Sequence, residues 1–420
     1  MLGVDEAQRP VKPSFLIISQ VYVPDPASVG QHVADAAAEM ARRGYRTIVY
    51  TASRGYDDPS RRYPAREVLD GVEVRRLPFS SFGKSSIAVR LLAQSIFLLQ
   101  AAVLGICTRG LCGVMVSTSP PFCGIAGVII GGIRRVPVKY WLMDLNPDQM
   151  VAMKLLPASS LPVRIFDAFN RAILRHSASV IVLDRFMAAR VLHKLPGVAT
   201  KLEVMPPWPH DNHLENLAHS DNPFRQARVS PGKLAIMYSG NHSAANPLRT
   251  LLDAAKRLES DPRLLVISIG GGGAKSEVED RIAAGASNIV SLPYQPLDQL
   301  RFSLSAADVH VVSIGSDVVG IVHPCKVYGA MAVSRPILLL GPSPSHISDL
   351  IKQYGIGWQI SHGDDEGAIQ VLRQILDTPA NILDEMGRRA ADAVARTLSR
   401  AQLLNRFCDV LQRGLPAPTA

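Results

Sequence analysis

The chain has 420 residues, of which 47% are hydrophobic and 19% are charged, a composition of folded globular domains rather than of disordered or collagen-like chains. This length predicts two or three domains. Its five cysteines form no C-x-x-C pair, which excludes a disulfide framework or a zinc site and fits a reducing compartment. The N-terminal segment holds acidic residues and no apolar run, so we expect no signal peptide and a cytoplasmic protein.

Short apolar runs alternate with helical patterns through the first half of the chain. An Ala-rich helix is predicted over 33–43, and Gly44 is a natural residue to end it. Near-continuous apolar strands in β-α-β order are typical of a parallel sheet that is covered on both faces. The sequence therefore predicts an α/β domain with strands at 15–21, 47–51, 72–76, 114–117, 138–143 and 180–183.

The segment 87–107 is strongly apolar but contains Arg90, Gln94 and Gln100. A spanning helix needs about 20 residues with few polar ones. A largely buried helix of a soluble domain is favoured, an interfacial helix is the second interpretation, and a transmembrane span is the third.

The positive charge is concentrated in the same half of the chain. Residues 84–201 hold 14 Lys and Arg against 4 Asp and Glu, within a net charge of +9 for the whole chain. Such a domain indicates an anionic partner, although a solvated basic face is an equally good interpretation. No nucleic-acid-binding module is present, so we expect no nucleic acid partner. An anionic inner membrane surface or a pyrophosphate-bearing lipid fits better.

The proline-rich segment 206–229 interrupts the pattern and is predicted to be a linker between domains. The alternation then restarts, with a helix over 247–258, a helix over 325–332 and a final amphipathic helix over 399–413. The strands of this second half are predicted at 234–238, 264–269, 289–292, 309–313, 336–340 and 357–360. Two doubly wound units in tandem are expected, and ligands bind such sheets at the carboxyl ends of the strands.

Four successive loops of the second half therefore share one rim of the predicted sheet. Glycines in such loops let the backbone approach a phosphate, although tight structural turns are the alternative. Neither a Walker motif nor a dinucleotide-binding fingerprint accompanies them. The candidate binding residues on these loops and directly after them are Gly240, Asn241, His242, Gly270, Gly272, Tyr294, Gln295, His323, Pro324, Cys325 and Tyr328.

Lys326 is the candidate catalytic residue of this rim. A lysine is unfavourable at a helix N-terminus unless an anion lies beside it, and His323 and Pro324 crowd the same turn. A surface lysine after a proline turn is the alternative interpretation.

The motifs of the second half resemble those of family 4 glycosyltransferases, in the branch of bacterial polysaccharide and O-antigen biosynthesis. The resemblance is specific over 234–340 and weaker before 200. It rests on Tyr238-Ser239-Gly240-Asn241, Gly270 to Gly273, Leu292-Pro293-Tyr294-Gln295-Pro296, and His323-Pro324-Cys325-Lys326-Val327-Tyr328 followed by Ala330-Met331-Ala332.

This resemblance implies the GT-B fold, which has two Rossmann-like domains separated by a deep cleft. The acceptor domain would span 1–205, the linker 206–229 and the donor domain 230–397, and residues 398–420 could pack back on the first domain. It further implies transfer of a sugar from a nucleotide donor, for which we expect a UDP-linked sugar. The basic, apolar region 84–201 favours a lipid-linked acceptor, such as one carried on a polyprenyl diphosphate, or a glycan acceptor. Retention of the anomeric configuration and no cofactor or bound metal are also implied.

The sequence departs from the family at a pair of glutamates separated by seven residues, because Ile321 and Gly329 occupy the two positions. Lys326 and Tyr328 occupy the region instead, and the leaving diphosphate would be neutralised by Lys326 and by backbone N–H groups. In the first domain Asp144 is the candidate acceptor-side base, with a turn cap as its alternative. Asp148 and His32 are weaker candidates, and a histidine at a helix start is more often structural.

Two other functions stay open at this point. A sugar-nucleotide epimerase could use the same architecture, but few carboxylates and histidines surround the presumed donor loops. A degenerate transferase that acts as a binding subunit is supported only by the missing glutamate pair.

Overall fold

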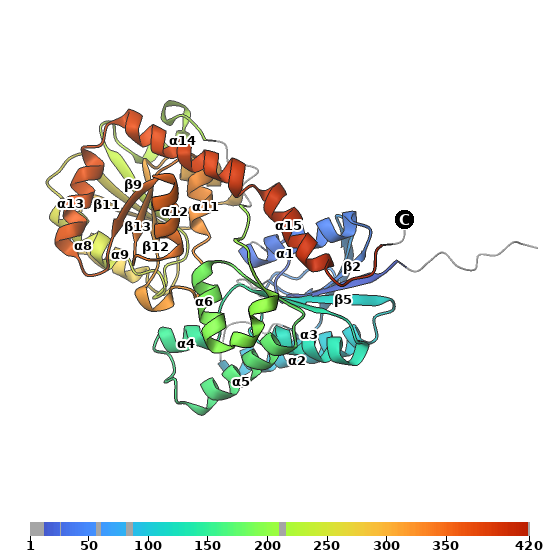
Figure 1. The fold of residues 1–420 in the computed structure, drawn as a ribbon. Coiled ribbons are helices and arrows are strands. Elements are labelled where there is room, and N and C mark those ends of the chain that lie inside the picture. The colour runs from blue at the N-terminus through green and yellow to red at the C-terminus, as the bar shows by residue number, and fades with distance from the viewer. Residues whose placement is uncertain (1–11, 26, 56–59, 81–86, 210–215, 419–420) are drawn as a thin grey trace, which may run out of the picture. The chain divides into compact units, whose positions relative to one another are not determined.

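The computed structural model describes residues 12–25, 27–55, 60–80, 87–209 and 216–418 (Figure 1). The chain divides into two compact units. Unit 1 comprises residues 1–151, 156–207 and 401–420, and unit 2 comprises residues 152–155 and 208–400. Each unit is built around its own sheet, so the predicted two-domain α/β class is confirmed.

Unit 1 holds an eight-stranded sheet in the order β3-β4-β2-β1-β5-β6-β7-β8. The six predicted strands are all present, as β1 (Ser14–Ile18), β2 (Arg46–Ala52), β4 (Val72–Leu77), β5 (Leu111–Val116), β6 (Val138–Leu142) and β7 (Ser179–Val182). The sequence prediction missed the edge strands β3 (Arg66–Leu69) and β8 (Leu202–Val204). Both are short and partly exposed, so neither has the continuous apolar run of a central strand.

Six helices of unit 1 connect these strands. They are α1 (Ser28–Arg42), α2 (Ile87–Ile106), α3 (Cys123–Arg134), α4 (Asp148–Ala152), α5 (Leu161–His176) and α6 (Arg185–Lys194). The predicted helix at 33–43 begins earlier, and Gly44 follows its end with a φ of 93°. The apolar segment forms α2, which buries Phe97 but leaves Leu99 67% exposed, so it is less buried than predicted. Across the described residues, no helix has both the length and the apolarity to cross a bilayer.

Unit 2 holds a six-stranded, all-parallel sheet in the order β11-β10-β9-β12-β13-β14. All six strands were predicted within one residue at each end. They are β9 (Leu234–Ser239), β10 (Leu264–Ile269), β11 (Ile289–Leu292), β12 (Val309–Ser313), β13 (Ile337–Leu340) and β14 (Gly357–Ile360).

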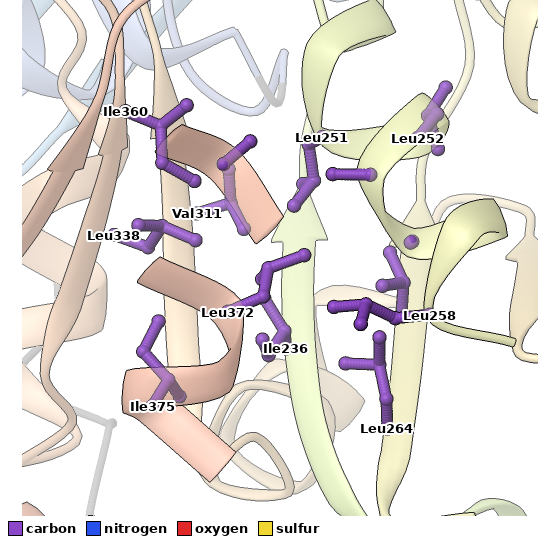
Figure 2. Packing of buried hydrophobic residues seen from close by; sticks show 14 of the residues in the cluster. Ile236, Leu251, Leu252, Leu258, Leu264, Val311, Leu338, Ile360, Leu372 and Ile375 are labelled. Carbon is purple, nitrogen blue, oxygen red and sulfur yellow. The ribbon is translucent and has the colours of Figure 1, made fainter. Parts of the chain in front are cut away.

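Side chains alternate between the two faces of this sheet, and each face builds its own core. Ile236 of β9 packs on one face with residues of α8 (Arg249–Arg257) and α13 (Asp365–Leu376), as Figure 2 shows. Its neighbour Met237 packs on the opposite face, with Phe224 of α7 (Pro223–Arg228) against the same cluster. Burial on both faces explains why the strands are nearly continuous apolar runs.

The strand order also locates a switch point in unit 2. From β9 the chain adds β10 and β11 on one side, then returns to place β12, β13 and β14 on the other side. β9 and β12 are neighbours, so the loops that leave their carboxyl ends run in opposite directions along the sheet. Such a point is where open α/β sheets bind ligands.

After α14 (Ala380–Thr397) in unit 2, the chain returns to unit 1 through α15 (Arg400–Gln412). The ring of Phe407 on α15 lies 4.4 Å from that of Trp141 on β6. Arg43 Nη1 donates to Asp409 Oδ1 at 2.7 Å, and the buried Lys139 Nζ donates to the carbonyl of Arg413 at 2.6 Å. The C-terminal helix is thus built into the core of unit 1.

Candidate functional site

Lys326 joins the two loops of the switch point in unit 2. It is the first residue of α11 (Lys326–Ala332), which follows the long loop after β12. Its Nζ donates to the hydroxyl of Tyr238 and, at 3.3 Å, to the carbonyl of Asn241, and it lies 4.0 Å from the centroid of the Tyr238 ring. Tyr238 lies at the end of β9 and Asn241 lies in the loop that follows. The structure thus brings together Lys326, Gly240 and Asn241.

The electrostatics of this site favour an anion. Burial lowers the pKa of the half-buried Lys326 to about 7. The pKa of His242 is lowered to about 4, first by its burial and then by the positive charges of Lys275 and Lys326. His242 is therefore uncharged at neutral pH between two lysines. An anion in this position would gain from the positive charge of the lysines.

His242 has an incomplete set of hydrogen bonds. Its Nε2 lies 2.7 Å from the hydroxyl of Ser268 on β10, and its ring meets that of Tyr238 edge-on at 4.9 Å between centroids. Its buried Nδ1 has no hydrogen-bond partner among the residues that the structure describes. Buried polar atoms are nearly always satisfied, so this atom suits a ligand or a water.

Three glycines allow the loops after β9 and β10 to touch. Gly240 and Gly270 have φ angles of 139° and 131°, which side chains rarely adopt. A Cβ on Gly270 would overlap the carbonyl oxygen of Gly240, and a Cβ on Gly272 would overlap that of His242. The backbone N–H of His242 donates to the carbonyl of Gly271 at 2.8 Å, which ties the two loops together. The predicted glycine positions therefore serve close backbone approach.

Replacing Gly270 by alanine should destabilise the protein by about 1–3 kcal/mol, because the new Cβ adds backbone strain to a clash with a carbonyl oxygen. Gly273 is a matched control in the same loop. It has no positive φ, and a Cβ there meets nothing within 4 Å, so Gly273→Ala should leave stability unchanged. Denaturant unfolding of both variants measures the difference. Equal destabilisation would contradict the assigned role of Gly270.

A second polar cluster lies on the same rim. The hydroxyl of Tyr328 lies 2.9 Å from His323 Nε2 and 3.0 Å from His346 Nε2, and the two histidine rings are 4.4 Å apart. His346 begins α12 (His346–Tyr354), in the loop region after β13. Sequence reasoning missed His346 because it followed only four of the strand-end loops. The position of His346 after a fifth predicted strand is the signal that could have found it.

The remaining predicted residues lie at the edge of this arrangement. Tyr294 is 59% exposed, and its hydroxyl donates to the carbonyl of Gly271 at 3.3 Å. Gln295 bonds within its own loop, to the carbonyl of Pro293 at 2.9 Å. Pro324 is buried, and the thiol of Cys325 lies 3.6 Å from the carbonyl of His323. Tyr294 thus adjoins the loop of Gly270 to Gly273, whereas this hydrogen bond of Gln295 stays within its own loop.

Asp144 lies in unit 1, two residues after β6, at the carboxyl edge of that sheet. It is half-buried, and its backbone N–H donates to the hydroxyl of Thr118, which follows β5, at 3.3 Å. Asp148 instead pairs with Lys194, and the buried His32 holds its Nδ1 2.9 Å from the carbonyl of Ser28. These contacts favour structural roles for Asp148 and His32. Among the described residues, no three His, Cys, Asp or Glu side chains are grouped to hold a metal ion.

Comparison with known proteins adds family information to this geometry. Residues 28–208 match the family model described as "Glycosyl transferase 4-like domain". The chain is 22% identical over 245 residues to the probable glycosyltransferase WbjE of Pseudomonas aeruginosa, a match that spans 58% of this chain and 61% of WbjE. It is 24% identical over 293 residues to the putative colanic acid biosynthesis glycosyl transferase WcaI of Escherichia coli K12, spanning 68% and 70% of the two chains.

Among solved structures, the chain resembles HepE of Anabaena in complex with UDP-glucose. The TM-score is 0.68 at 13% sequence identity, and the match covers 95% of this chain and 99% of HepE. At this identity the likeness concerns the fold alone. Both units are covered, and the fold is the GT-B arrangement of two Rossmann-like domains.

Proposed function

We propose that the protein belongs to the glycosyl transferase 4-like family, whose model matches residues 28–208, and that it transfers a sugar from a UDP-linked donor. The acceptor is a lipid-linked or glycan chain in cell-surface polysaccharide biosynthesis, by analogy with WcaI, a putative colanic acid biosynthesis enzyme. The observation that carries the proposal is the site at Lys326, where this lysine and the glycine turns after β9 and β10 can receive a diphosphate. HepE, which shares the fold and was solved in complex with UDP-glucose, supports the choice of nucleotide.

In this mechanism Lys326 neutralises the charge that develops on the leaving diphosphate. Its ammonium is already held by Tyr238 and Asn241, so little reorganisation is needed when charge appears. The glycine turns allow the diphosphate to approach the backbone of the loops after β9 and β10. These groups can neutralise the leaving diphosphate, as a divalent cation does in metal-dependent enzymes. We therefore propose a metal-independent transfer, with retention of configuration.

The other candidate residues receive roles around this centre. The exposed ring of Tyr294 offers a face for the nucleoside base. The half-buried His323 and His346, which flank the buried hydroxyl of Tyr328, offer ring nitrogens for the sugar hydroxyls. Asp144, at the carboxyl edge of the sheet in unit 1, is the acceptor-side base. The protein would work on the inner face of the plasma membrane, where lipid-linked acceptors are available.

A panel of nucleoside diphosphates and their sugar conjugates tests the donor. A ligand at 100 times its dissociation constant stabilises the folded state by about 2.7 kcal/mol, so a selective ligand raises the melting temperature. We expect UDP and one UDP-sugar to do so. Product analysis without acceptor separates a transferase from an epimerase, which would interconvert the donor. If no member of the panel stabilises the protein, the proposal is wrong.

The affinity for UDP-glucose should fall about tenfold between roughly pH 6 and pH 8. Below its pKa of about 7, Lys326 is a cation and meets the diphosphate directly. Above that pKa, the neutral lysine must take up a proton when the anion binds, so affinity falls as the pH rises. UDP-glucose suits this measurement by calorimetry because its diphosphate has no terminal phosphate that titrates near pH 6, unlike free UDP.

The matched control for this pH dependence is Lys326→Arg. A guanidinium stays charged over the whole range, so the affinity of this variant should change little with pH, whatever its absolute value. If the wild-type affinity is also independent of pH, Lys326 does not titrate near pH 7 and the predicted coupling between its proton and the diphosphate is wrong.

A further inference from the structure

Unit 1 carries an apolar outer surface formed by three helices. α2, α3 and α5 lie side by side (Figure 1), with α3 in contact with both others. Of the 16 exposed large hydrophobic residues in the described part of the chain, ten lie on these three helices. This concentration is more than the scattered exposure that is normal for a soluble surface. The most informative members are Leu92, Leu99 and Val103 on α2, Ile133 on α3, and Ile165 and Phe169 on α5.

The exposed positions follow the period of the helices. Leu92, Leu99 and Val103 are separated by seven and four residues, and Ile165 and Phe169 by four, so each set lies on one side of its helix. The opposite sides are buried, with Phe97 of α2 and Leu174 of α5 among the covered residues. These helices therefore turn an apolar side toward the outside of unit 1.

The charges around this surface have one sign. The exposed arginines Arg109 and Arg135 follow the ends of α2 and α3, and Arg164 and Arg175 are exposed on α5. The described parts of the three helices contain a single carboxylate, Asp167, and it is paired with Arg171 and Lys194. An apolar face with a cationic rim is the pattern of proteins that lie on anionic bilayers.

The same pattern disfavours a second copy of this chain as the occupant. A symmetric dimer through this surface would bring each cationic rim against its own copy, without carboxylates to compensate. A bilayer that contains anionic lipids offers both an apolar phase for the aliphatic side chains and negative headgroups for the arginines. Its chemistry therefore complements both parts of the surface.

The surface also reaches the carboxyl edge of the sheet in unit 1. Phe122, in the loop between β5 and α3, contacts Phe166 edge-on at 4.1 Å and lies 6.0 Å from Phe169. The recess beside these rings is also lined by Asn146, in the loop that follows β6 and contains Asp144. Apolar side chains thus extend from the outer face of α5 to the loops of the candidate acceptor side.

We infer that unit 1 docks on an anionic bilayer through the outer face of α2, α3 and α5. The inference rests on the proposed function, because docking there would present the loops after β5 and β6 to a lipid-linked acceptor. Docking through this face requires no spanning helix, and it uses the apolar residues and the arginines together.

Flotation of the full-length protein with vesicles tests this inference. The wild type should bind vesicles of equimolar phosphatidylglycerol and phosphatidylcholine at low salt, and bind phosphatidylcholine vesicles at least about tenfold less. The double variant Leu99→Glu, Ile133→Glu should lose roughly tenfold or more of its binding to the anionic vesicles. Val68→Glu is the matched control, because Val68 is 68% exposed on β3, outside this surface, and should keep full binding.

Three outcomes would overturn the inference. The first is absence of wild-type binding to the anionic vesicles, and the second is an equal loss of binding in the control and the double variant. The third is a wild-type protein that binds no vesicles but forms a dimer, which the double substitution converts to a monomer.

Stabilisation by UDP is measured on the same samples. If UDP stabilises a protein that ignores vesicles, docking fails and the donor proposal stands. If the protein binds vesicles but no nucleotide, docking stands and the donor proposal fails.

Discussion

Replacing Lys326 by methionine should lower the rate of sugar transfer by about 10²–10³-fold, the usual effect of removing one preorganised charge-stabilising group. The side chain has nearly the same length but carries no charge, so the contacts with the Tyr238 ring are largely kept. Stabilisation by UDP should fall as well. The UDP released on donor turnover measures the transfer rate, and a thermal shift measures stabilisation by UDP.

The stability of this variant separates catalysis from folding. Among the described residues, Lys326 makes its polar contacts with a hydroxyl and a carbonyl, not with a carboxylate. Burial of a charge without a counter-ion costs stability, which is why the pKa of Lys326 is low. Lys326→Met should therefore melt at the same temperature as the wild type or higher, as is common when a strained functional group is removed.

The exposed Lys352 on α12 of the same unit provides the control, and Lys352→Met should leave transfer and melting unchanged. A Lys326→Met protein that is inactive and also less stable than the wild type would indicate a structural role. Full activity in Lys326→Met would exclude Lys326 from the reaction.

Much of this site could be predicted from the sequence because parallel strands impose a simple geometry. Once the strands of unit 2 are located by their apolar runs, the loops after them must share one edge of the sheet. This reasoning brought Gly240 and Lys326 together although they lie 86 positions apart, and the structure places Lys326 against the loop of Gly240. The strand order itself was not needed, because every loop in question leaves a carboxyl end.

Other features depend on contacts that the sequence pattern does not encode. The loop after the fifth predicted strand could have pointed to His346, but its contact with Tyr328 is not encoded in the sequence pattern. The exposed side of α2 was missed for a related reason. Apolar residues occur all around this helix, so the sequence favoured a largely buried helix over an interfacial one, whereas several of its large apolar side chains are exposed.

The weaker acid candidates show how a partner decides the role of a residue. Asp144 ends a predicted strand and Asp148 follows four positions later, and the sequence does not show which partner either carboxylate has. In the structure the carboxylate of Asp148 is bound by Lys194, which comes from the distant α6. No spacing rule could have predicted that ion pair, which favours a structural role for Asp148.

Replacing Phe407 by alanine should destabilise unit 1 by about 3–5 kcal/mol, the usual cost of removing a buried phenylalanine ring. Phe407 is 1% exposed and packs on Trp141 in β6, whose ring is also 1% exposed. Because β6 leads directly to Asp144, loss of this contact would loosen the strand that positions the acceptor-side candidate. Amide hydrogen exchange of peptides from β6 measures the effect in unit 1 alone, without assuming that the two units unfold together.

The neighbouring residue supplies the control for this prediction. Arg406 lies on the exposed side of α15, so Arg406→Ala should change stability by no more than about 0.5 kcal/mol. Peptides from the core of unit 2, such as those of β9, should exchange alike in both variants. If Phe407→Ala leaves exchange in β6 unchanged, the C-terminal helix covers unit 1 without stabilising it. If exchange rises in β6 together with β9, the two units share one cooperative transition, and α15 stabilises both.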